Sequence, residues 1–85
     1  KVLNTYQEQE RMKLRADEYF INDNYLAAIY EYEKILDIRQ SDRLGVEFYA
    51  HVWNNLGVCY CRLFQFGRAA QAFRTSWQYQ KDRRS

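Results

Sequence analysis

One short run of residues constrains the fold of this chain more than any other feature, because two large rings, a branched aliphatic side chain and a glycine recur at helical spacing. These residues are Trp53, Leu56, Gly57 and Tyr60, at positions i, i+3, i+4 and i+7. Residues at this spacing share one face of an α-helix. The run therefore predicts a helix with one bulky apolar face that contains a gap.

A second helix is expected to pack on that face. Ala69 and Phe73 lie four residues apart, and Ala72 and Ser76 add two more small side chains nearby. Gly57 has no side chain, so it would let the second helix approach closely. The segment therefore predicts a close antiparallel helix pair.

A weaker copy of the pattern lies upstream, where residues of similar type follow in the same order. Its members are Met12, Ala16, Tyr19, Ala28 and Tyr32, in the places of Trp53, Gly57, Tyr60, Ala69 and Phe73. Arg15 departs from the pattern, because Leu56 occupies that place downstream. The alternative, two unrelated amphipathic hairpins, does not explain why the same types recur in the same order.

The pattern W-x2-L-G-x2-Y followed by A-x3-F resembles a repeat of the tetratricopeptide (TPR) family. The resemblance covers residues 9–80 and implies an all-α fold: two antiparallel helix-turn-helix repeats, with four helices, as a fragment of a right-handed α-solenoid. It implies one TPR-like domain over residues 1–85, with repeat one at about 9–42, repeat two at about 43–80 and an N-terminal helix extension at 1–8. Because stable arrays of this family need more repeats, we expect a fragment of a longer protein.

Apolar periodicity and turn residues set the expected bounds of the helices, at about 2–21, 25–39, 43–63 and 66–81. The Asn-Asp-Asn run at 22–24 predicts a turn, since these residues tolerate left-handed backbone and cap helices. Ser41 and Asp42 offer an N-cap for the third helix. Phe64 disfavours a positive φ, so we expect Gln65 or Gly67 to shape the second turn.

The connection between the repeats is longer than is usual in the family. Ala28 and Ala69 are 41 residues apart, and the usual period is about 34, so the excess is about two helical turns. One extra turn on the second helix and one on the third would keep both apolar faces in phase. This predicts an elongated hairpin around residues 40–45; a loop without regular structure is the alternative.

Composition excludes several classes of function. The chain has no proline and three glycines, which favours long helices, and its net charge of +2 argues against binding to nucleic acid or to a membrane by bulk electrostatics. No stretch resembles a signal peptide or a membrane span. Nucleic-acid binding through the arginines is a weaker alternative; these are Arg62, Arg68, Arg74, Arg83 and Arg84.

No motif points to catalysis, a metal or a cofactor. His51 is the single histidine, and Glu47 four residues before it fits a hydrogen bond on the helix surface better than an acid/base dyad. Cys59 and Cys61 lie on different helix faces and lack the spacing of a zinc site. Unpaired cysteines fit a reducing compartment, so we expect a cytoplasmic protein. Because no catalytic motif is found, we expect that it is not an enzyme.

The resemblance implies a binding role, because the first helix of each TPR repeat lines a groove that holds an extended peptide. The positions that it carries over as peptide-binding are Lys13, Asp17, Phe20, Asn54, Asn55, Val58 and Arg62. One subfamily binds the C-terminal carboxylate of chaperones, and only Lys13 and Asn55 match its pattern, because Asp17 replaces an expected asparagine.

The function expected from this resemblance is that of a protein-protein interaction module, a scaffold or adaptor with a protein or peptide partner. The alternative is a structural spacer or self-association unit within a longer TPR array. Trp77 and Tyr79 lie beyond the consensus positions and are the candidates for such a homo-oligomeric contact.

Overall fold

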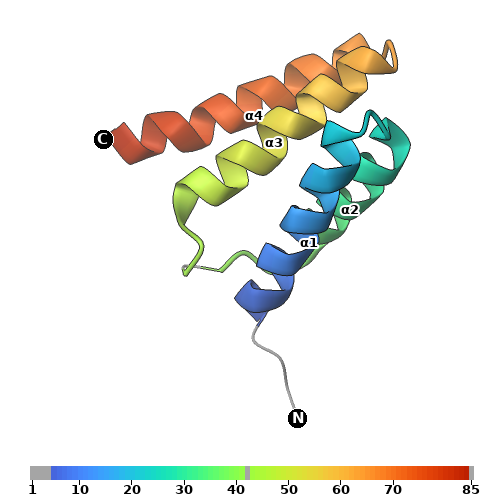
Figure 1. The fold of residues 1–85 in the computed structure, drawn as a ribbon. Helices are drawn as coiled ribbons and strands as arrows, with labels where there is room; N and C mark the ends of the chain where they lie inside the picture. Colours follow the sequence, from blue (N-terminus) through green and yellow to red (C-terminus); the bar gives the residue numbers. More distant parts are fainter. Residues whose placement is uncertain (1–4, 42, 85) are drawn as a thin grey trace. The chain divides into compact units, whose positions relative to one another are not determined.

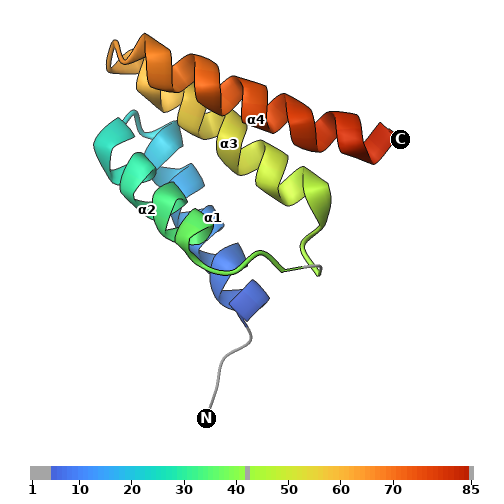
Figure 2. The ribbon, with the colours of Figure 1, turned by 180° about the vertical axis from the view of Figure 1, so that it is seen from behind.

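The computed structural model describes residues 5–41 and 43–84, which form four α-helices and no strand. Thr5–Ile21 (α1) pairs with Tyr25–Asp37 (α2), and Gly45–Arg62 (α3) pairs with Phe66–Arg84 (α4). Each pair belongs to one of two compact units, residues 1–43 and 44–85. Figure 1 and Figure 2 show the helices of each pair side by side and antiparallel, joined by a short turn. The predicted all-α fold of two helix-turn-helix pairs is confirmed.

The turn between α1 and α2 follows the sequence prediction. Asp23 has a φ of 63°, in the left-handed region. Its N–H donates to the carbonyl of Phe20 at 3.1 Å, and the N–H of Asn24 donates to the carbonyl of Tyr19 at 2.9 Å. These two bonds close the helix end in a Schellman motif, which satisfies carbonyls that the helix would otherwise leave unpaired.

The turn between α3 and α4 repeats this geometry in the second unit, but not with the residue that we expected. Phe64 itself adopts a φ of 63°. Its N–H donates to Cys61 at 3.0 Å, and the N–H of Gln65 donates to Tyr60 at 2.8 Å. The prediction that Phe64 would avoid a positive φ is wrong. The two bonds of the motif and the continuation into α4 hold an aromatic residue where glycine is preferred.

The predicted extra turn on the second helix is also wrong, because α2 ends at Asp37, two residues early. The N–H of Ile38 and the buried side-chain amide of Gln9 both donate to the carbonyl of Ile35, at 3.2 Å and 3.1 Å. A longer helix would offer that carbonyl to the N–H of Arg39. Ile38 instead takes extended backbone, with φ −86° and ψ 145°.

The third helix begins later than expected, and its N-cap is Leu44. The prediction of a cap at Ser41 and Asp42 is therefore wrong; Asp42 lies outside the described residues. The hydroxyl of Ser41 accepts a hydrogen bond from the N–H of Arg43 at 3.2 Å, within the connection. Gly45 then starts α3 with a φ of 70°, which other residues rarely adopt.

The remaining helix ends lie close to the expected ones. α1 ends at Ile21 as predicted, α3 ends one residue early at Arg62, and α4 continues to Arg84. The predicted start of the first helix, at residue 2, lies outside the described residues. In the part of the chain that the structure describes, no helix is long and apolar enough to cross a membrane.

The close approach predicted at Gly57 is confirmed. A Cβ atom at Gly57 would lie 2.5 Å from Cε1 of Phe73, so the ring of α4 occupies the space that any side chain on α3 would need. Ala69 and Ala72, on the same helix as Phe73, are buried. Small residues therefore set the distance between α3 and α4.

Candidate functional site

The candidate site is one face of α3 on which polar side chains predominate. Its members lie three, four or one residue apart, and we call them the α3 polar face: Glu47, His51, Asn54, Asn55, Val58 and Arg62. This spacing puts them on one side of the helix. Opposite lie buried residues such as Val52, Leu56 and Cys59, which hold α3 in its unit. The apolar side of α3 thus fixes which side chains its polar side presents.

A recess of about 340 Å³ opens beside the N-terminal half of this face. Its lining is polar except for one alanine and comprises Glu47, Ala50, His51, Asn54 and Gln80. Carboxylate, imidazole and amide groups offer both hydrogen-bond donors and acceptors. A peptide backbone, which also carries both, is a chemically suitable ligand for such a recess.

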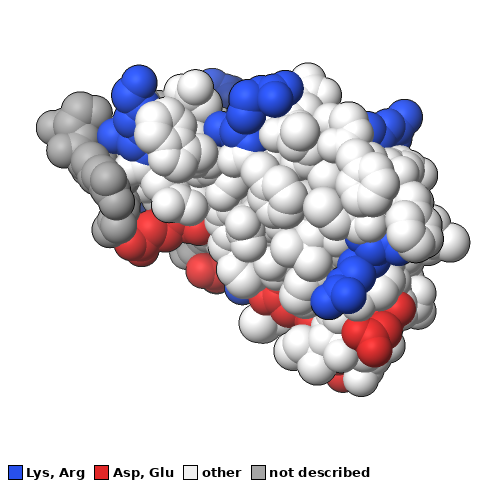
Figure 3. Space-filling view, turned by 90° about the horizontal axis from the view of Figure 1, so that it is seen from above, with Lys and Arg blue, Asp and Glu red and all other residues white. Residues whose placement is uncertain are grey.

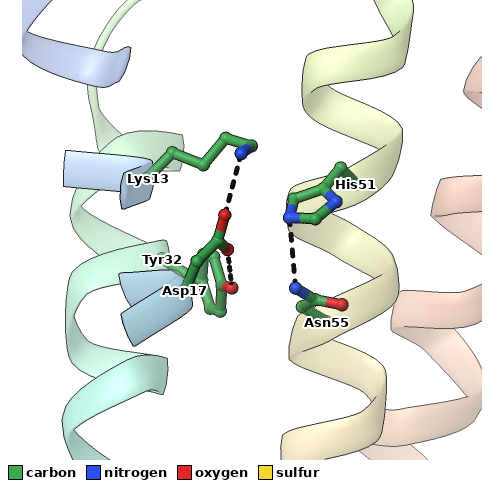
Figure 4. Close-up of polar contacts among 5 residues, drawn as sticks. All are labelled: Lys13, Asp17, Tyr32, His51 and Asn55. Atoms are coloured by element: carbon green, nitrogen blue, oxygen red, sulfur yellow. Dashed lines mark hydrogen bonds and ion pairs between the residues drawn. The ribbon is translucent and has the colours of Figure 1, made fainter. Parts of the chain in front are cut away.

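Two members of the face lie within hydrogen-bond distance of each other. The Nδ2 atom of Asn55 lies 3.2 Å from Nε2 of His51, one helical turn away (Figure 4). The amide nitrogen carries only donor hydrogens, so it donates to Nε2 in the tautomer that leaves this ring nitrogen without a proton. This contact orients the side chains of His51 and Asn55 along the helix.

The C-terminal half of the face is more open. Arg62 is exposed in the last turn of α3, where a cation suits the helix dipole. Val58, one turn earlier, is half-buried and is the apolar member of the face. Asn54 is exposed. The predicted positions on α3 therefore lie together on one accessible face.

The predicted positions on α1 make a different arrangement, because two of them bind each other. Nζ of Lys13 lies 2.8 Å from Oδ2 of Asp17, and the hydroxyl of Tyr32 on α2 donates to Oδ1 of the same carboxylate (Figure 4). The charge of Asp17 is therefore offset within the unit. Asp17 joins α1 to α2 through Tyr32, and neither Lys13 nor Asp17 is presented as an isolated charge.

The third predicted position on α1 contacts the turn. The ring of Phe20 packs edge-on against that of Tyr25, with centroids 6.2 Å apart and planes at 76°. Phe20 is half-buried. Its aromatic surface thus stabilises the α1–α2 turn as well as offering an apolar contact.

An ion pair lies where the first unit departs from the sequence pattern of the second, with Arg15 in the place of Leu56. Oε1 of the buried Glu31 lies 3.7 Å from Nη1 of Arg15 and 3.3 Å from Nζ of Lys34. The equivalent residues downstream are Leu56 and Ala72, both buried. An ion pair in one unit therefore takes the place of an apolar contact in the other.

The two candidates for self-association have different surroundings. Tyr79 is half-buried and stacks on Tyr49 of α3, with ring centroids 5.9 Å apart and planes at 24°. Trp77 is 56% exposed, and Nζ of Lys81 lies 5.3 Å from its ring centroid. Trp77 is thus the one of the two that presents a large apolar surface.

A second recess, of about 290 Å³, lies between α3 and α4. Its walls are Trp53, Tyr60, Arg68, Gln71, Ala72 and Thr75. The guanidinium carbon of Arg68 lies 5.9 Å from the ring centroid of Tyr60. The sequence predicted that Trp53 and Tyr60 pack in the interface between the two helices. In the structure, both residues also line this recess beside α4.

The two cysteines are unbridged, as expected. Cys59 is fully buried, and burial raises the pKa of its thiol from 9.0 to about 11, although a backbone hydrogen bond acts in the opposite direction. Cys61 is half-buried. A buried thiol with a raised pKa stays protonated near neutral pH and serves as a small apolar side chain.

Two residues that contribute to these contacts were not predicted from the sequence. Gln80, near the end of α4, completes the polar recess, and only the folded pair brings it to Glu47 and His51. Tyr32 binds Asp17, and here a signal existed: the equivalent residue, Phe73, has no hydroxyl.

No family model, curated protein or solved structure matches the chain.

Proposed function

We propose that the chain is a protein-protein interaction module of the TPR type, which binds an extended peptide or a helix along the α3 polar face. The observation that carries this proposal is the row of hydrogen-bonding side chains on α3 beside the recess of about 340 Å³. The turn geometry that recurs in both units supports the TPR assignment. A scaffold or adaptor role follows from such binding.

The chemistry of the face suits a peptide. The amides of Asn54 and Asn55 can donate to carbonyls and accept from N–H groups. Arg62 can pair with a carboxylate of the partner, and Val58 adds apolar contact.

Helix propensity favours a functional reading of the two asparagines. Asn is a poor helix former, and each one in a helix interior costs a few tenths of a kcal/mol relative to alanine. Asn54 and Asn55 stand adjacent in the middle of the 18-residue α3. A purely structural helix surface would be more stable with other residues there.

The first test is selection of peptides from a random library displayed on phage, followed by fluorescence anisotropy titration of the enriched sequences. The variant Asn54→Ala/Arg62→Ala should weaken binding by tenfold or more, because it removes an amide and a cation from the face. Its matched control, Gln78→Ala/Arg68→Ala, removes the same groups from exposed positions of α4 and should bind as the wild type does. Equal affinity of both variants would refute the proposal.

A structural role within a longer TPR array is the second candidate, and the exposed ring of Trp77 favours it. An exposed aromatic surface of this size marks an interface more often than a solvated surface. In that role the α3 polar face is idle, and display selection would enrich no peptide. Either role fits a cytoplasmic protein, since both cysteines are unbridged.

A further inference from the structure

Five exposed side chains of α4 form a strip that carries aromatic and basic groups. We call it the basic strip, and its members are Phe66, Ala70, Arg74, Trp77 and Lys81. Their spacing of three or four residues puts them on one face of the helix. Phe66 is 61% exposed and Trp77 is 56% exposed, so the strip presents two large rings to solvent.

A second strip, of opposite charge, lies on α2. We call it the acidic strip, and its members are Leu26, Tyr30, Glu33 and Asp37, all exposed. Leu26 is 70% exposed and Tyr30 is 62% exposed. Nζ of Lys34 lies 5.0 Å from the ring centroid of Tyr30 and 3.3 Å from Oε1 of Glu31, an oxygen that also lies 3.7 Å from Nη1 of Arg15. Glu33 and Asp37 give the strip two carboxylates.

The net charges of the two units have the same signs as their strips. Residues 1–43 contain nine acidic and seven basic residues, whereas residues 44–85 contain two acidic and six basic residues. No acidic residue lies between Glu47 and Asp82. Figure 3 shows Lys and Arg side chains spaced among uncharged ones over much of the surface in view.

We propose that the chain associates with a second copy of itself, with the basic strip of α4 in one copy docked on the acidic strip of α2 in the other. The two strips match in chemistry, since each combines two large apolar side chains with two charges. They also match in spacing. An antiparallel register that sets Trp77 against Tyr30 sets Arg74 against Glu33, because Arg74 lies three residues from Trp77 and Glu33 lies three residues from Tyr30.

The contact is heterologous, because each copy contributes a different surface. After pairing, one copy retains its unused acidic strip and the other its unused basic strip, so association continues into open chains or closes into a ring. Two short helical strips bury less area than a standard interface, so the association is weak. This inference makes no use of the α3 polar face and stands or fails independently of peptide binding.

Analytical ultracentrifugation of the full chain over a wide concentration range tests the proposal. The weight-average mass of the wild type should rise with concentration and fall when salt is added. Arg74→Glu alone and Glu33→Arg alone should each weaken association by about tenfold or more, because like charges then face each other. An equimolar mixture of the two variants should associate as the wild type does, since each reversed strip finds a complementary one.

Arg68→Glu is the matched control, because it makes the same change in net charge on α4 outside the basic strip. It should leave association intact, and circular dichroism should show the same helix content for all variants. A wild type that stays monomeric at every concentration would overturn the proposal. That result is also expected if the basic strip binds an anionic lipid surface or another acidic protein instead of a second copy. Failure of the mixture to associate, or equal loss in Arg68→Glu, would overturn it too.

Discussion

The hydroxyl of Ser76 on α4 donates a hydrogen bond to the backbone carbonyl of Ala50 on α3, at 2.7 Å. The equivalent positions of the first unit are Ile35 and Gln9, where the buried amide of Gln9 donates to the carbonyl of Ile35 at 3.1 Å. Both units thus join the same two positions with a buried bond, but the donor has moved from one helix to the other. The same need, a polar link between the two helices, is met from opposite sides.

This relationship predicts unequal costs of truncation. Ser76→Ala should lower the free energy of unfolding by about 1 kcal/mol, because it removes one hydrogen bond and little volume. Gln9→Ala should cost more, about 2 kcal/mol or above, because it also empties a fully buried site. Urea denaturation followed by circular dichroism measures both. Thr75→Ala, which removes a hydroxyl bonded only to its own helix, should be nearly neutral; an equal cost for all three would contradict the account.

Glycine at position 57 is required by the ring of Phe73. Gly57→Ala should lower the free energy of unfolding by about 1–3 kcal/mol, since the new methyl group would meet that ring at 2.5 Å. Gly67→Ala is the matched control, because nothing lies within 4 Å of its Cβ position. It should be neutral or raise stability by roughly 0.5 kcal/mol through helix propensity. Thermal melts of both variants check the sign difference, and a stabilising Gly57→Ala would disprove the close approach.

The left-handed backbone of Phe64 has an energetic cost that a better turn residue would relieve. Phe64→Asn should raise the free energy of unfolding by about 1 kcal/mol, because asparagine tolerates a positive φ. The edge-on contact of Phe64 with Phe66, at 6.2 Å, opposes this gain but lies at an exposed surface. A lower melting temperature for Phe64→Asn would mean that the ring contact outweighs the backbone cost.

The buried thiol of Cys59 makes stability depend on pH in the alkaline range. The pKa of the thiol is about 11 in the folded state against 9.0 for an exposed thiol, so between these values the unfolded chain loses a proton that the folded chain keeps. The stabilising contribution is complete below pH 9 and is lost as the pH rises to 11, by about 2–3 kcal/mol. Urea denaturation from pH 8 to 11 should show a steeper fall for the wild type than for Cys59→Ala. Identical slopes would contradict the burial of the thiol.

Helical periodicity and small residues were enough to predict the four helices, their pairing and the close approach at Gly57. These features depend on residues that act within one helix or across one pair, and that information is local in the sequence.

The errors lie where a backbone group has competing partners. The end of α2 depends on a hydrogen bond from Gln9, 26 residues away, to the carbonyl of Ile35. No local sequence pattern predicts that bond. The φ of Phe64 reflects the two bonds of its turn, which overrode the preference of the residue. The candidate site was located by resemblance. The pairing of Lys13 with Asp17, at i, i+4 within α1, is local, whereas the bond from Tyr32 to Asp17 and the place of Gln80 beside α3 depend on tertiary packing.

The most direct test of peptide binding along α3 is to titrate a display-selected peptide into the isotopically labelled chain and map the changes in its 1H–15N NMR spectrum. If the peptide binds along α3, the largest chemical-shift changes should follow the α3 polar face, at His51, Asn54, Asn55, Val58 and Arg62. The side-chain amides of both asparagines should be among them. Shifts confined to α4 around Trp77, or none at saturating peptide, would contradict it.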